Sequence, residues 1–87
     1  MYGVTFTDTA LDNLKKFPDK DKTLILNKIE LLAENPLNMP NVKKLVNFAT
    51  SYRLRTGNYR ILFEREDNLK IIDIIDVLHR KQAYRRK

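Results

Sequence analysis

The chain has 87 residues and a mass of 10.3 kDa, which suffices for one small domain over residues 1–87 with at most two layers and excludes a two-domain enzyme. Hydrophobic residues make up 43% and charged residues 32%, a balance typical of globular proteins. The absence of cysteine excludes a disulfide scaffold and a cysteine nucleophile, and a single histidine excludes a multi-histidine metal site. We therefore expect a soluble cytoplasmic protein with no metal, no cofactor and no membrane segment.

Positive charge is concentrated in the second half of the chain. Residues 1–40 carry five lysines against six acidic residues, a net charge of −1, whereas residues 41–87 carry twelve basic against five acidic residues, a net charge of +7. Such asymmetry is typical of proteins that bind nucleic acid or an acidic protein, although a basic surface that only maintains solubility is the simpler alternative.

The first half predicts a strand followed by two helices. Residues 2–6 are rich in strand formers, and Thr7 or Asp8 can cap a helix that Pro18 ends. A longer helix begins near Asp19 or Asp21 and ends at Asn35-Pro36, because apolar residues recur at helical spacing between them. The two helices are expected to form a hairpin that covers the core face of a sheet. Residues 36–41 read as a loop, and residues 42–46 as a short edge strand.

Two strands joined at Gly57-Asn58 follow, and their register can be derived. A two-residue turn that needs positive φ at its first position places Thr56 opposite Tyr59 and Leu54 opposite Ile61. Five large side chains and one threonine then share a core face: Tyr52, Leu54, Thr56, Tyr59, Ile61 and Phe63. The other face, called the arginine face from here on, carries Arg53, Arg55 and Arg60 with Leu62.

The last strand is expected over residues 70–78, in the centre of the sheet because it is apolar on both faces. If Asp67-Asn68 closes the hairpin before it, Ile72 and Ile74 join the core face. The residues predicted on the arginine face are then Asp73, Ile75, Val77 and His79. The tail over residues 80–87 adds five positive charges and one aromatic residue, Tyr84.

Three guanidinium groups on one face predict an anionic ligand. Like charges placed opposite each other in a sheet cost stability, and guanidinium donors match phosphate oxygens. The alternative is a surface ion-pair network in which Asp73, Glu64 and solvent satisfy the arginines.

RNA cleavage is one chemistry that such a face could perform without a metal. The 2′-hydroxyl next to a scissile phosphate attacks the phosphorus, provided that the phosphate is positioned, its charge is stabilised and protons are transferred. His79 is the candidate for proton transfer, and Tyr84 could hydrogen-bond the 2′-hydroxyl or stack on a base. A structural histidine and a tyrosine that packs the tail are the alternatives.

Two motifs carry a resemblance to a known family. Residues 52–64 read YRLRTGNYRILFE and residues 79–85 read HRKQAYR, preceded by Val42-Lys43-Lys44-Leu45. Together they resemble the RelE/ParE superfamily of bacterial toxins, nearer the RelE branch, over almost the whole chain. The resemblance implies an α+β fold, similar to microbial ribonucleases, with an N-terminal strand and helical hairpin packed on one face of a small antiparallel sheet.

The resemblance also implies a function. Members of the RelE branch enter the ribosomal A site, cleave mRNA there by metal-independent attack of the 2′-hydroxyl, and are inhibited by a cognate antitoxin, expected here to be a small acidic protein. The implied catalytic positions are Arg53, Arg60, His79, Arg80 and Tyr84. The implied RNA or ribosome contacts are Lys43, Lys44, Arg55, Lys81 and Arg85. The main alternative is a ParE-like toxin that poisons DNA gyrase and cleaves nothing; a non-catalytic RNA- or protein-binding module is the other.

Overall fold

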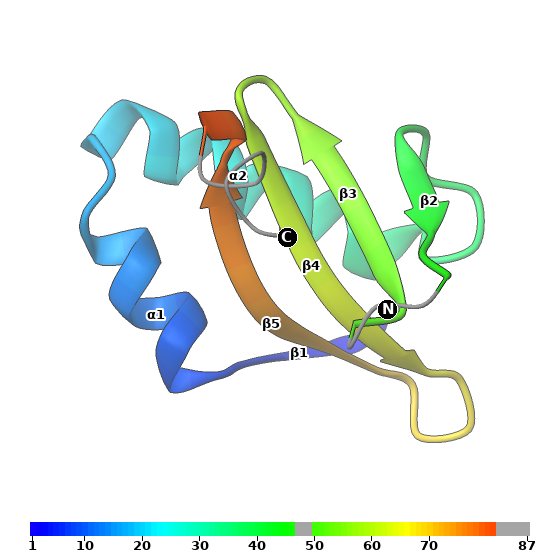
Figure 1. The fold of residues 1–87 in the computed structure, drawn as a ribbon. Coiled ribbons are helices and arrows are strands. Elements are labelled where there is room, and N and C mark those ends of the chain that lie inside the picture. Colours follow the sequence, from blue (N-terminus) through cyan, green and yellow to red (C-terminus); the bar gives the residue numbers. More distant parts are fainter. Residues whose placement is uncertain (47–49, 82–87) are drawn as a thin grey trace.

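A computed structural model describes residues 1–46 and 50–81 of the chain (Figure 1). In chain order its elements are β1 (Gly3–Phe6), α1 (Asp8–Lys15), α2 (Asp19–Glu34), β2 (Val42–Lys44), β3 (Tyr52–Thr56), β4 (Tyr59–Glu66) and β5 (Ile71–His79). The predicted order of strand, two helices and a strand meander is confirmed.

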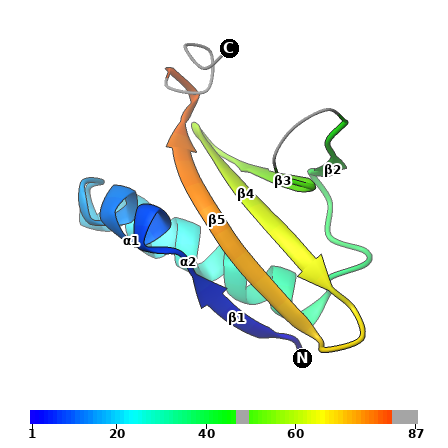
Figure 2. The same cartoon turned by 60° about the horizontal axis from the view of Figure 1, so that its bottom comes forward.

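The strands form a single sheet in the order β1-β5-β4-β3-β2, with both helices on one face (Figure 2). As predicted, β5 is an interior strand, since it lies between β1 and β4. The sheet is mixed rather than antiparallel, because β1 joins its edge and pairs with β5 in parallel from Gly3 opposite Ile71 to Phe6 opposite Ile74. None of the helices in residues 1–46 and 50–81 has both the length and the apolar character to span a bilayer.

Local sequence determines where the helices begin. The Thr7 side chain accepts a hydrogen bond from the Ala10 N–H at 3.1 Å, and so caps α1. Pro18 stands at the N-cap of α2, where its missing N–H costs nothing, and two aspartates occupy the first turn, which favours negative charge. Burial of one face then stabilises α2 against the sheet. Its buried residues are Ile25, Ile29, Leu32 and Ala33.

The β3–β4 hairpin has the predicted register. Arg55 pairs with Arg60 and Thr56 with Tyr59, and Gly57 takes a φ of +56°, which an L-residue other than glycine rarely adopts. The predicted core face is buried: Leu54, Thr56, Tyr59, Ile61 and Phe63 are each at most 6% exposed, and Tyr52 packs against them.

The predicted register of β5 against β4 is wrong, and beyond a bulge the predicted assignment of its two faces is wrong as well. The connection covers residues 67–70 instead of two residues, which keeps Ile72 and Ile74 on the core face. A β-bulge then interrupts the pairing, since Phe63 lies opposite Ile74 but Leu62 lies opposite Asp76. One extra residue in β5 exchanges the two faces beyond that point. Val77 therefore packs in the core, and His79 lies opposite Tyr59 instead of on the arginine face.

Helix α1 holds the bulge in place. The Thr7 hydroxyl donates to the Ile75 carbonyl at 2.6 Å, and the Asn13 amide donates to the Asp76 carboxylate at 2.6 Å. The Val77 N–H also donates to that carboxylate, which is 4% exposed. A polar helix face thus supplies partners for the irregular backbone and for the buried acid.

Candidate nucleic-acid interface

The arginine face lies on the side of the sheet opposite α2. Arg55 and Arg60 are direct cross-strand neighbours, whose Cβ atoms in such pairs are about 4.5–5.5 Å apart, and Arg53 lies on the diagonal. Lys43 of β2 pairs with Arg53 and extends the positive row to the sheet edge. Four of the predicted cations are therefore gathered on one face.

Arg53 is the most constrained of these cations. It is partly buried, and its Nε is buried without a hydrogen-bond partner among the described residues. Burial, followed by the charges of Arg55 and Arg60, lowers the pKa of Arg53 below that of an ordinary guanidinium, although the group stays protonated at physiological pH. An anion bound to this face would relieve the repulsion among the three guanidinium groups.

The alternative to an anionic ligand is an ion-pair network in which Glu64 and Asp73 satisfy the arginines, but both carboxylates bind other groups. Glu64 accepts a hydrogen bond from the Ser51 N–H at 3.0 Å, and Asp73 accepts one from the Thr5 hydroxyl at 2.8 Å. Both acids therefore serve the backbone or a neighbouring strand. Glu64 thus ties β4 to the backbone before β3, and Asp73 ties β5 to the edge strand β1.

His79 does not lie with the arginines. Its ring packs edge-on against Tyr59, with centroids 5.3 Å apart and an interplanar angle of 89°. Tyr59 belongs to the core face, where it also contacts Phe17 at 4.7 Å and donates to the Asp21 carboxylate at 2.6 Å. Burial, with help from that hydrogen bond, raises the pKa of Tyr59 to about 12. His79 thus caps the end of an aromatic cluster beneath the sheet.

Arg80 follows at the end of β5. Its N–H donates to the Asn58 carbonyl at 2.6 Å, which continues the ladder past His79. Leu78 lies opposite Arg60, and Arg80 begins a helical turn two residues later, directly after the end of β5. The bulge therefore moves His79 off this face, and Arg80 follows it as an exposed residue next to the β3–β4 turn.

The remaining predicted contacts are distributed differently. Lys44 pairs with Tyr52 and so starts on the side opposite Lys43, at an exposed edge. Lys81 is exposed one residue beyond Arg80. Tyr84 and Arg85 lie outside the described residues.

Sequence reasoning missed the groups that fix the bulge, namely Thr7, Asn13 and Asp76. A signal for them was present. Strict alternation from Ile72 and Ile74 would have placed the Asp76 carboxylate in the core and Val77 outside it, an arrangement that an extra residue before Asp76 avoids. Within residues 1–46 and 50–81 no three His, Cys, Asp or Glu side chains are grouped so that they could hold a metal ion.

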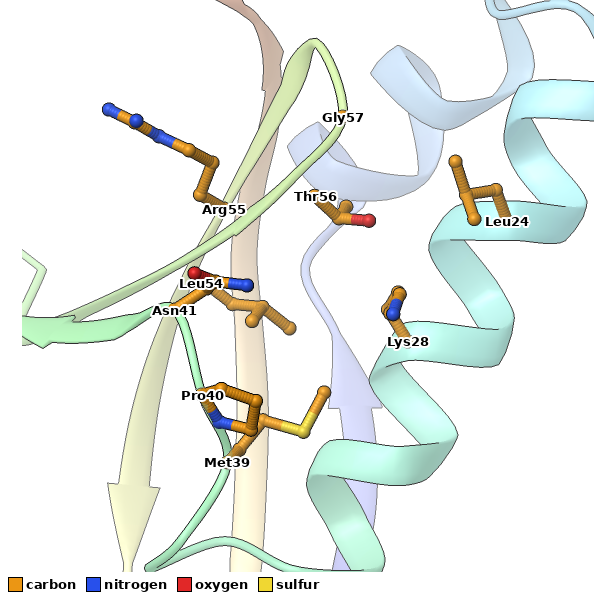
Figure 3. A pocket seen from close by; sticks show the side chains of 9 residues that line it. All are labelled: Leu24, Lys28, Met39, Pro40, Asn41, Leu54, Arg55, Thr56 and Gly57. Atoms are coloured by element: carbon orange, nitrogen blue, oxygen red, sulfur yellow. The ribbon is translucent and has the colours of Figure 1, made fainter.

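A pocket of about 320 Å³ lies across β3 from the arginine face, between α2 and the loop before β2 (Figure 3). Leu54 and Thr56 of the core face line it, together with Leu24, Lys28 and Met39. Arg55 contributes to the wall, but its side chain extends away from α2 in Figure 3. The pocket and the arginine face are therefore separate features.

Comparison with known proteins places this geometry in a family. Residues 4–84 match the family model described as the ParE toxin of the type II toxin–antitoxin system parDE. The chain belongs to this toxin family. No curated protein sequence gives a significant match.

Solved structures similar to this toxin are RelE toxins and their complexes. A chain of the RelBE2 toxin–antitoxin complex from Mycobacterium tuberculosis is 31% identical with a TM-score of 0.79, over 91% of this chain and 98% of that one. A chain of the RelB–RelE complex from Methanococcus jannaschii is 29% identical with a TM-score of 0.75, over 95% and 98% of the two chains. Isolated E. coli RelE, at 20% identity over 99% and 98% of the chains, shares the fold with a TM-score of 0.75. The protein is a type II toxin with a RelE-like α+β fold.

Proposed function

We propose that this toxin is a ribosome-dependent endoribonuclease that cleaves mRNA in the A site and so inhibits translation in the cytoplasm. The observation that carries the proposal is the arginine face, where Arg53 lies beside two further guanidinium groups and its buried Nε has no partner within residues 1–46 and 50–81. The similarity to RelE structures supports the same assignment.

The proposed reaction is an internal phosphoryl transfer. The 2′-oxygen of the RNA attacks the neighbouring phosphorus, the bond to the 5′-oxygen breaks, and negative charge grows on the phosphate oxygens. Arg53 and Arg60 would hold these oxygens from β3 and β4, and Arg80 would approach from the end of β5. Fixed guanidinium groups stabilise such charge without reorganising during the reaction.

The reaction also needs two proton transfers, because the 2′-hydroxyl loses a proton and the leaving 5′-oxygen gains one. The resemblance to the RelE branch implies that Tyr84 lies near the attacking 2′-hydroxyl, and we propose that role for it. His79 was the other candidate from sequence, but its position against Tyr59 favours a different role, argued below. Lys43, Lys44, Arg55, Lys81 and Arg85 are proposed to contact RNA or ribosome, so binding should weaken steeply with salt.

The proposed partner is an acidic antitoxin that covers the arginine face. The structures from M. tuberculosis and M. jannaschii contain their toxins together with antitoxins. A net charge of +7 on residues 41–87 of this chain is complementary to an acidic segment that folds as it binds.

Poisoning of DNA gyrase is the second candidate function, because the matching family model is that of ParE toxins. The fold does not separate the two activities. Purified toxin added to a translating extract decides between them. Cleavage within A-site codons, lost in a folded Arg80→Ala variant, supports the nuclease, whereas intact transcripts together with blocked supercoiling of DNA by gyrase support the alternative.

A further inference from the structure

The end of β5 contains a side-chain to backbone hydrogen bond that the proposed chemistry does not use. Residues 80 and 81 adopt helical geometry directly after His79, and the His79 Nδ1 accepts a hydrogen bond from the Lys81 N–H at 3.2 Å. The first N–H groups of a helical turn have no partner within it, and a side-chain acceptor one residue before the turn commonly supplies one. His79 occupies the place of an N-cap residue.

The first N–H of the turn, that of Arg80, is also satisfied. The Arg80 N–H donates to the Asn58 carbonyl at 2.6 Å, so Arg80 is tied to the β3–β4 turn while Lys81 is tied to His79. These two bonds set the direction in which the chain leaves β5. They therefore hold the Arg80 backbone at the end of β5, next to β4, the strand that carries Arg60.

The His79 ring is itself fixed from below the sheet. Tyr59 contacts it edge-on at 5.3 Å, and Tyr59 is held by its hydrogen bond to Asp21 at 2.6 Å and by Phe17. The β5 bulge places the imidazole on this side, opposite the arginines. A general acid must reach the atom that it protonates within hydrogen-bond distance, and the imidazole starts on the face opposite Arg53 and Arg60, the proposed phosphate ligands.

We propose that His79 is a positioning residue that caps the turn carrying Arg80, and that it does not donate a proton to the RNA. The role rests on the proposed function of Arg80 as a phosphate ligand. Nδ1 must be unprotonated to accept the Lys81 N–H, so the neutral ring carries its proton on Nε2. A small displacement of Arg80 would be costly, because catalytic groups displaced by about 1 Å lose on the order of 100-fold in rate.

Substitutions that imitate one ring nitrogen at a time test this role. Asparagine places an oxygen close to the position of Nδ1 and is a good N-cap, glutamine reaches toward Nε2, and neither amide can transfer a proton. His79→Asn should keep mRNA cleavage within about threefold of the unmodified toxin, since it preserves the cap. His79→Gln and His79→Ala should each lose about tenfold or more, since they release the turn. Equal and severe losses in all three variants would overturn the proposal and favour proton transfer.

Hydrogen exchange provides a readout that does not depend on any activity. The Lys81 amide should be protected in the unmodified toxin and in His79→Asn, and should exchange about five- to tenfold faster in His79→Ala and His79→Gln. Equal exchange in all four proteins would refute the cap. If the toxin cleaves no RNA, this comparison still decides the role of His79, and the proposed function alone fails.

The unmodified protein offers a test that avoids the risk of misfolded variants. The chain has one histidine, so long-range ¹H–¹⁵N spectra of the imidazole need no assignment. The proposal requires an unprotonated Nδ1 and a protonated Nε2 in the neutral ring. A ring protonated on Nδ1 would contradict it.

Discussion

Replacing Arg53 with methionine should make this toxin more stable, although a positive charge is lost from its proposed ligand site. The Arg53 Nε is buried without a partner in the part of the chain that the structure describes, and an unpaired buried donor costs about 1–3 kcal/mol. The neighbouring Arg55 and Arg60 add repulsion, and the partial exposure of Arg53 reduces both effects. Methionine keeps an unbranched apolar stem in the same space. We expect a gain of about 1 kcal/mol, which for a domain of this size raises Tm by about 4–8 °C.

Arg65 provides the matched control on the opposite side of β4. Its Nη1 donates to the Pro36 carbonyl at 3.0 Å, its Nε lies 2.8 Å from the Asp67 carboxylate, and its guanidinium sits 4.8 Å from the centre of the Tyr52 ring. Arg65→Met removes satisfied contacts and should cost about 1–2 kcal/mol. Urea unfolding of both variants measures the contrast. A loss of stability in Arg53→Met comparable with that in Arg65→Met would refute the reasoning.

The same pair of variants separates binding from folding. Arg53→Met should reduce the dependence of single-stranded RNA affinity on salt, with the slope of log K against log salt falling by about 0.7 for one phosphate contact. Arg65→Met should leave that slope unchanged, since Arg65 starts on the face opposite the arginines. Equal slopes for both variants would show that Arg53 does not contact phosphate.

Three further predictions concern the scaffold. The folded state raises the pKa of Tyr59 from 10 to about 12, so the contribution of this group to stability is complete below pH 10 and is lost as the pH rises to about 12. Urea titrations should show a loss of about 2–3 kcal/mol at alkaline pH that is absent in Tyr59→Phe. An identical loss in both proteins would exclude Tyr59 as its cause. Gly57→Ala should cost about 1–2 kcal/mol in the same assay, because the φ of +56° strains an L-residue, and Gly57→Asn should cost less. The cost comes from the backbone and not from a clash, since the nearest atom to an added Cβ is 3.8 Å away. Equal stability of the two variants would contradict this. Asn13→Ala removes the amide that donates to the buried Asp76 carboxylate at 2.6 Å, and should cost about 1.5–3 kcal/mol by urea unfolding. A change below about 0.5 kcal/mol would mean that this contact does not hold the bulge.

The β3–β4 hairpin could be predicted from sequence because a short turn determines its register. Gly57-Asn58 leaves two residues between the strands, so every pair up to Tyr52 opposite Phe63 follows from the turn and from the alternation of side chains. That alternation also assembled Arg53, Arg55 and Arg60 correctly. Local information was sufficient there because no irregularity interrupts the ladder.

The position of His79 could not be derived in the same way. It depends on a bulge in β5 whose cause is tertiary: Thr7 and Asn13, more than 60 residues away in sequence, bind Ile75 and Asp76. One inserted residue reverses every side chain beyond it. The parallel pairing of β1 is likewise a long-range contact that strand propensity alone does not reveal.

The most direct test of the central claim is to map the 5′ ends of a translated message after adding the purified toxin. The account predicts new ends within codons that occupy the ribosomal A site, and their disappearance with an Arg80→Ala variant that unfolds like the unmodified protein. Messages that remain intact while DNA gyrase loses its supercoiling activity would contradict it.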